Sequence, residues 1–131
     1  MKIVLMAHDN KKKLMQNLCV AYRHVLGKHE LYATGTTGQL VSQTVNLPVH
    51  KYLSRHLGGE QQVATQVAHN DVDLLVFLRD PFQRGDEYDS KVLLLCDAHN
   101  IPVATNPATA ETLFLALDRG DLDWRNLARK S

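Results

Sequence analysis

The sequence lacks the features that mark several large classes of protein. Its two cysteines, Cys19 and Cys96, each lie in an apolar helical pattern, so both are predicted to be buried free thiols. No residues have the spacing of metal ligands. No apolar run approaches the roughly 18 residues of a membrane-spanning helix, and the apolar start is too short and too soon followed by charge for a signal peptide. We therefore expect a soluble cytoplasmic protein that does not bind membranes.

An excess of charge of one sign is also lacking. Lysine and arginine number 15 against 14 aspartates and glutamates, which gives a net charge of +1. Bulk electrostatics therefore provide no argument for a nucleic-acid partner. What is present is a globular composition, with 131 residues of which 44% are hydrophobic and 22% charged. We expect one domain spanning residues 1–131, with a full hydrophobic core and no internal repeat.

Short apolar runs alternate with segments of helical spacing along the whole chain. The runs predict five strands, at residues 3–7, 30–33, 49–53, 72–78 and 101–105. The helices are expected at residues 11–26, 39–45, 61–69, 92–98, 109–117 and 122–128. On the first helix, spacing predicts a buried face that carries Leu14, Leu18, Ala21, Tyr22 and Val25. This alternation predicts an α/β fold, a doubly wound sheet of about five mostly parallel strands with helices on both faces.

A turn rich in threonine and glycine follows the second predicted strand and leads into a helix. It reads Thr34-Gly35-Thr36-Thr37-Gly38. Glycines let the backbone approach a ligand closely, and the first turn of a helix offers amide groups without partners to an anion. The threonine hydroxyls add further donors. The alternative is an ordinary strand-to-helix turn in which a threonine caps the helix.

Other polar clusters follow the remaining predicted strands. In a parallel sheet the carboxyl ends of the strands meet at one edge, where ligands bind. These clusters are His8-Asp9, Ser54 to Glu60, Arg79-Asp80 and Thr105-Asn106. Their hydroxyls, cations and carboxylates favour a phosphorylated small molecule as ligand, with carboxylates available for proton transfer.

The same segments resemble the methylglyoxal synthase family, in the same order and at closely similar spacing. The resemblance covers nearly the whole chain. It rests on His8-Asp9, Lys12, Tyr32 to Gly38, Ser54, Gly58-Gly59 with Gln61-Gln62, Phe77 with Arg79-Asp80-Pro81, and Ile101 to Asn106.

The resemblance implies a lyase that converts dihydroxyacetone phosphate to methylglyoxal and inorganic phosphate. It also implies no metal or organic cofactor, and a homohexamer. The catalytic carboxylates it implies are Asp9, Glu60 and Asp80. The substrate and its phosphate are expected at His8, Lys12, Thr34, Gly35, Thr36, Thr37, Ser54 and Arg55.

The chain departs from the family pattern in three places. The usual base is the aspartate of Gly-Gly-Asp-Gln-Gln, where this chain has Glu60, and the usual Ser-Gly-Pro is Ser54-Arg55-His56. The loop at residues 82–89 is shorter than usual and has no histidine. The backbone amide of Arg55 still serves phosphate if its backbone angle suits a residue with a Cβ. His56 either enters the site from its own loop or points to solvent, and we expect the second.

The resemblance and the departures from it lead to two hypotheses about function. The first is the lyase, with Glu60 as the base that removes a proton beside the substrate carbonyl. The second is a sensor of a phosphorylated metabolite that does not catalyse, by analogy with other domains of similar fold. For Glu60 itself the alternative role is to cap a helix that begins at Gln61, where the helix dipole favours an acidic residue.

Overall fold

A parallel five-stranded sheet forms the centre of the molecule. The computed structural model describes residues 1–83 and 87–130. Every strand pairing is parallel, and the strand order is β3-β2-β1-β4-β5. The strands are β1 (Lys2–Ala7), β2 (Glu30–Ala33), β3 (Val49–Lys51), β4 (Leu74–Leu78) and β5 (Val103–Ala104).

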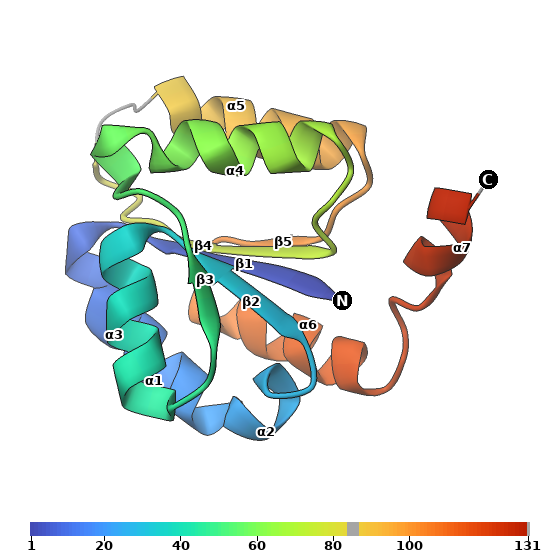
Figure 1. Ribbon diagram of the computed structural model, residues 1–131, viewed down its shortest axis with the longest axis horizontal. Helices are drawn as coiled ribbons and strands as arrows, with labels where there is room; N and C mark the ends of the chain where they lie inside the picture. Colours follow the sequence, from blue (N-terminus) through green and yellow to red (C-terminus); the bar gives the residue numbers. More distant parts are fainter. Residues whose placement is uncertain (84–86, 131) are drawn as a thin grey trace.

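Helices cover both faces of this sheet, as Figure 1 shows. One face carries α1 (Lys12–Ala21), α2 (Arg23–Leu26), α3 (Gly35–Val45) and α6 (Pro107–Asp118), and the other carries α4 (Gly59–Ala68) and α5 (Glu87–Ala98). Single 3₁₀ turns, η1 (Asp9–Lys11) and η2 (Arg55–Leu57), precede α1 and α4, and α7 (Trp124–Lys130) ends the described chain. The predicted doubly wound α/β fold is confirmed.

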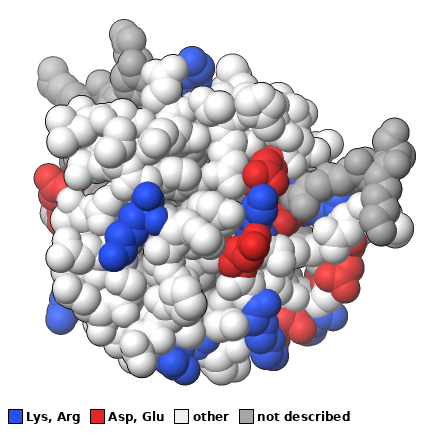
Figure 2. Space-filling view, in the orientation of Figure 1, with Lys and Arg blue, Asp and Glu red and all other residues white. Residues whose placement is uncertain are grey.

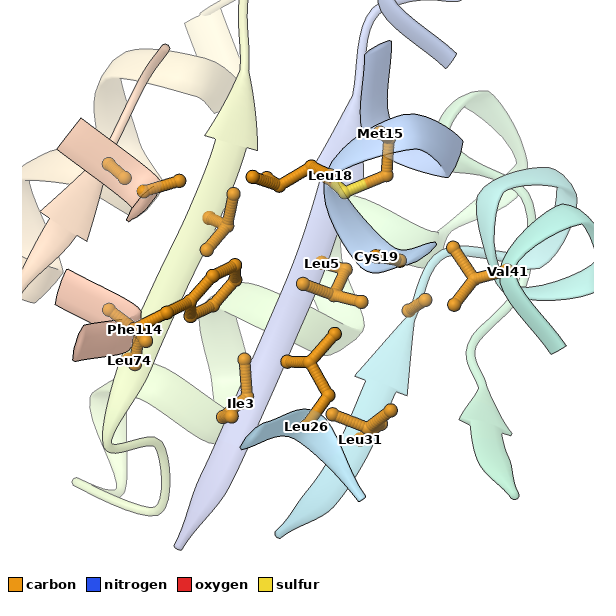
Figure 3. Packing of buried hydrophobic residues seen from close by; sticks show 14 of the residues in the cluster. Ile3, Leu5, Met15, Leu18, Cys19, Leu26, Leu31, Val41, Leu74 and Phe114 are labelled. Atoms are coloured by element: carbon orange, nitrogen blue, oxygen red, sulfur yellow. The ribbon is translucent and has the colours of Figure 1, made fainter. Parts of the chain in front are cut away.

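The two faces of the sheet bury separate hydrophobic clusters. The larger cluster packs Ile3 and Leu5 of β1 against Leu18 of α1 and Phe114 of α6 (Figure 3). The smaller cluster packs Val4 and its neighbours against α4 and α5. Because successive strand residues point to opposite faces and both faces are covered, the central strands must be apolar throughout. This explains the unbroken apolar runs of β1 and β4.

The chain leaves β1 at the middle of the sheet, builds β2 and β3 on one side, and then returns to build β4 and β5 on the other. The strand order therefore reverses between β1 and β4, and ligands bind beyond the carboxyl ends of the strands at such a point. Residues 8 and 79–80 directly follow these two strands.

The first predicted helix differs from the observed structure in its phase. Leu14 and Ala21 were predicted to be buried but are exposed, whereas Met15 and Cys19 are buried. Met15, Leu18 and Cys19 are three and four residues apart, so they form one helical face, and this is the face of α1 that packs on the sheet. A break at Tyr22 then separates α1 from α2, where predicted residue Val25 is buried.

Three predicted strands are longer than the observed ones. Strand β5 has two residues instead of the predicted five, and Pro102 next to it has no N–H group to donate to the sheet. Strand β3 ends at Lys51, and β4 begins at Leu74, after Asp73.

Within the described chain, no helix is both long and apolar enough to cross a bilayer. On the face drawn in Figure 2, basic and acidic side chains are interspersed.

Candidate active site

A small pocket lies beyond the carboxyl ends of β1, β2 and β3. It has a volume of about 80 Å³, enough for a small ionic group. Its wall consists of Ala7, Asp9, Lys12, Thr34, Thr36, Thr37, Ser54, Arg55 and His56. Most of the predicted phosphate-binding residues are therefore brought together from segments that are far apart in the sequence.

The threonine turn supplies hydroxyl groups to this pocket. Thr34 is the N-cap residue of α3, but its side chain makes no capping hydrogen bond, so the simple capping alternative does not describe this turn. Thr34 and Thr37 are each 2% exposed, and the Thr37 hydroxyl has no hydrogen-bond partner among the described residues. A buried hydroxyl without a partner costs roughly 1–3 kcal/mol. An anion in the pocket would remove this cost by accepting a hydrogen bond from Thr37.

Two glycines hold the segment that carries Ser54 against the threonine turn. The Gly35 amide donates to the Leu53 carbonyl at 3.2 Å, and the Gly59 amide donates to the Ser54 carbonyl at 3.0 Å. A Cβ on Gly59 would lie 2.0 Å from the Leu53 carbonyl oxygen, and one on Gly35 would lie 3.1 Å from the Ser54 amide nitrogen. Gly35 was predicted to contact phosphate, but its amide is engaged by Leu53 here and it does not line the pocket.

A lysine and a carboxylate face each other at the mouth of the pocket. Lys12 Nζ donates to Asp9 Oδ1 at 3.0 Å, and the side chains are 21% and 87% exposed. The hydrogen bond from Lys12 is the main cause that lowers the pKa of Asp9, with smaller contributions from the charges of Arg55 and His56. Asp9 therefore stays ionised and holds Lys12 at the pocket.

Arg55, which lines the pocket, forms a nearly buried ion pair with Glu60. Arg55 Nη1 lies 2.7 Å from Glu60 Oε1, and the side chains are 8% and 4% exposed. Glu60 itself does not line the pocket. Glu60 is not the N-cap of α4, which begins at Gly59 with Gly58 as its N-cap residue, but it lies in the first turn of this helix, where the dipole favours an acidic side chain.

His8 and Asp80 meet where the strand order reverses. The Asp80 backbone N–H donates to His8 Nδ1 at 2.8 Å. Because a backbone amide can only donate, Nδ1 must be the unprotonated nitrogen, and the neutral ring then carries its proton on Nε2. His8 is 2% exposed and packs edge-to-face on Phe77. Its ring is therefore fixed in one orientation and one tautomer.

The Asp80 carboxylate is held by two donors. The Phe82 amide donates to Oδ1 and Asn10 Nδ2 donates to Oδ2, each at 2.9 Å. The Phe82 hydrogen bond, followed by that of Asn10, lowers the pKa of Asp80. Asp80 lines a second hollow of about 440 Å³, next to Arg79 and Thr105.

Comparison with known proteins identifies the family. The MGS-like domain family matches residues 16–105. Among similar proteins, methylglyoxal synthase of Caldicellulosiruptor saccharolyticus is 54% identical, over 97% of this chain and 92% of that protein. Methylglyoxal synthase of Alkaliphilus metalliredigens is 51% identical, over 99% of this chain and 98% of that protein. The chain belongs to the MGS-like domain family.

A solved structure supports the same assignment for the fold. The crystal structure of methylglyoxal synthase from Elizabethkingia anophelis superposes with a TM-score of 0.80 at 35% sequence identity. The match covers 86% of this chain and 76% of that one. The resemblance inferred from the sequence is therefore confirmed.

For this MGS-like domain, sequence reasoning missed two polar contacts. His56 was expected to point to solvent, and although it is exposed it lines the pocket and lies 3.2 Å from Arg55 through Nε2. Asn10 makes no capping hydrogen bond to η1 or α1 and instead donates to Asp80. The Asn10–Asp80 contact has no local spacing signal, because it depends on how the segments that follow β1 and β4 meet, whereas Arg55 and His56 are neighbours in η2.

Two further predictions concern a metal site and the loop at residues 82–89. In residues 1–83 and 87–130, no three His, Cys, Asp or Glu side chains are grouped so that they could hold a metal ion. The predicted loop without a histidine, residues 82–89, falls partly outside the described residues, which omit 84–86.

Proposed function

We propose that this protein is a methylglyoxal synthase, a lyase that converts dihydroxyacetone phosphate to methylglyoxal and inorganic phosphate. Membership of the MGS-like family and relatives of that name at about half identity favour the lyase over a sensor that does not catalyse. The observation that carries the proposal for the site is the buried Thr37 hydroxyl without a partner among the described residues, next to Lys12 and Arg55. Such a site suits an oxyanion with several acceptor atoms.

The phosphate of the substrate occupies the pocket at the ends of β1 to β3. Lys12 and Arg55 provide positive charge, and the hydroxyls of the threonine turn and Ser54 donate hydrogen bonds. The first turn of α3 adds the Thr36 and Thr37 amides, which have no acceptor within the helix. Held in this way, the phosphate leaves with its developing charge stabilised.

Proton removal is assigned to the carboxylates around the pocket. Glu60 is the base that takes a proton from carbon next to the carbonyl, and Asp9 and Asp80 complete the catalytic carboxylates. The Nε2–H group of His8 is the donor that stabilises the developing enolate oxygen, since its tautomer is fixed by Asp80. No step requires a metal or an organic cofactor.

The Glu60→Gln variant tests the assignment of the base. Glutamine keeps the size of the side chain but cannot accept a proton, so methylglyoxal formation from dihydroxyacetone phosphate should fall to background. Calorimetry with inorganic phosphate should show that the variant still binds phosphate at least as well as wild type. Wild-type turnover by the variant would remove Glu60 from the mechanism.

A homohexamer and a cytoplasmic location belong to the same proposal. The support for the hexamer is family resemblance alone. Sedimentation velocity at micromolar concentration should show a species near six times 14.7 kDa. A single species with the mass of one chain would refute it.

A further inference from the structure

The Arg55 side chain belongs to two groups of residues at once. It lines the pocket together with Lys12 and the threonine turn, and its Nη1 atom is 2.7 Å from Glu60 Oε1. Its Nη2 atom lies 3.2 Å from His56 Nε2. A guanidinium group has five N–H donors in a rigid plane, so it can contact a carboxylate and a phosphate from one position or turn between them.

In this arrangement Glu60 is not placed to act as a base. Its side chain is 4% exposed, and the carboxylate lies behind Arg55 rather than on the pocket wall. A general base must come within hydrogen-bond distance of the proton it removes, directly or through one water. A carboxylate oxygen held by a guanidinium is also a weaker proton acceptor than one that is not.

We propose that the phosphate group of the ligand competes with Glu60 for Arg55, and that binding of the phosphate thereby releases Glu60 to act as the base. The proposal rests on the proposed lyase function. A phosphate dianion carries more charge than a carboxylate and matches the guanidinium fork with two oxygens. Lys12 on the same wall adds to the attraction of the dianion toward the pocket.

The chemical step that follows is balanced within the site. Glu60 takes the proton from carbon, and the C–H electron pair forms the enediolate. The carbon–oxygen bond to phosphate then breaks, its electron pair leaves with inorganic phosphate, and the carbon–carbon double bond shifts to give the enol of methylglyoxal. A proton added to the terminal carbon of this enol gives methylglyoxal and balances the proton taken by Glu60. Arg55 remains with the phosphate and neutralises its charge, so Arg55 acts as a positioning residue for Glu60 and as a ligand for the leaving group.

Because Arg55 exchanges Glu60 for the anion, anion binding is coupled to protonation of Glu60. When Arg55 turns to the anion, Glu60 loses a positive neighbour and binds a proton more readily. Among the described residues, the charged and titratable groups that line the pocket next to this pair are Lys12 and Asp9 from the α1 side and His56 from η2. Anion binding should therefore be accompanied by uptake of a fraction of a proton by Glu60.

Sulfate is the probe that tests this exchange without turnover, because sulfate, unlike phosphate, keeps the same charge at mildly acidic and neutral pH. Titration calorimetry with sulfate in two buffers of different ionisation enthalpy gives the number of protons taken up. Wild type should take up protons, and Glu60→Gln should not. Sulfate should also bind Glu60→Gln several-fold more tightly, since the carboxylate no longer competes for Arg55. Equal proton uptake and equal affinity in the two proteins would overturn the proposal.

Two further variants identify the side chains responsible for the proton uptake. His56→Gln should keep the uptake, which excludes His56 as its source. Arg55→Lys keeps a cation and should keep part of the uptake, whereas Arg55→Met should lose it and bind sulfate on the order of tenfold more weakly. If Arg55→Met does not fold, the Glu60→Gln and Arg55→Lys comparison still decides the question. An absence of methylglyoxal formation by wild type would refute the lyase assignment and leave the sulfate result standing.

Discussion

At the scale of single residues, the site combines side chains that are held in place by hydrogen bonds with one buried hydroxyl that makes none among the described residues. The Asp80 amide fixes the tautomer of His8, and two donors fix the Asp80 carboxylate. By contrast, Thr37 keeps a buried hydroxyl without a partner among the described residues. Stability alone does not favour such a hydroxyl, whereas binding of an oxyanion does.

The Thr37→Val substitution separates the effect of this hydroxyl on stability from its effect on anion binding. Valine has the same shape without the hydroxyl, so the free protein should become more stable by about 1 kcal/mol while phosphate affinity falls several-fold. Thermal unfolding and phosphate calorimetry measure the two effects. The control is Thr112→Val, because Thr112 is exposed on α6 and its hydroxyl donates to the Ala108 carbonyl, away from the pocket. Weaker binding together with a loss of stability would contradict this account of Thr37.

Both cysteines provide a second residue-scale prediction. Burial raises the pKa of the Cys19 thiol to about 12, and burial is likewise the main cause that raises the pKa of Cys96 to about 12. The native thiols should therefore resist alkylation at about pH 8 and react in denaturant. Their contribution to the free energy of unfolding is complete below the ordinary value near 9 and is lost as pH rises toward 12. Rapid alkylation of the native protein would show that the thiols are accessible.

At the scale of elements, the close approach of η2 and the start of α4 to the threonine turn builds the pocket. The segment with Leu53 and Ser54 runs between Gly35 and Gly59, which accept it only because neither has a Cβ. The sequence predicted the strands and most helices, since buried apolar runs and helical spacing are local signals. It could not predict the Arg55–Glu60 contact, because that contact depends on how η2 folds back on α4.

The Gly59→Ala substitution tests this close approach. A Cβ 2.0 Å from the Leu53 carbonyl oxygen must push the two segments apart, which should cost about 1–3 kcal/mol of stability and weaken phosphate binding. Gly27→Ala is the matched control, since its nearest neighbour, the Arg23 carbonyl oxygen, lies at 3.3 Å. Chemical denaturation and calorimetry give both quantities. If Gly59→Ala and Gly27→Ala behave alike, the packing of the segment does not shape the pocket.

At the scale of the whole molecule, different features lie at the carboxyl and amino ends of the strands. The carboxyl edge carries the pocket, and the amino edge carries a buried polar anchor for the last helix. Arg125 Nε lies 3.3 Å from Asp73 Oδ1, and these side chains are 3% and 1% exposed. Arg125 also donates to the Asn100 and Val72 carbonyls, so it ties the α7 segment to the start of β4.

Loss of this anchor should destabilise the protein without changing the site. Arg125→Met removes the buried guanidinium that pairs with Asp73, which should cost about 3–5 kcal/mol. Arg119→Met is the control, because Arg119 pairs with Asp121 on the surface and should contribute less than about 1 kcal/mol. Denaturant unfolding measures both. A loss in Arg125→Met no larger than that in Arg119→Met would show that the anchor is dispensable.

The amino terminus and α7 therefore share one side of the molecule. The amino group of Met1 lies 3.2 Å from His29 Nδ1 at the amino edge, and α7 is anchored at the same edge, opposite the pocket (Figure 1). A surface tether or a fused carrier protein attached after α7 would thus face away from the pocket proposed for the phosphorylated ligand. The protein can be immobilised through this end with its pocket still open to solution.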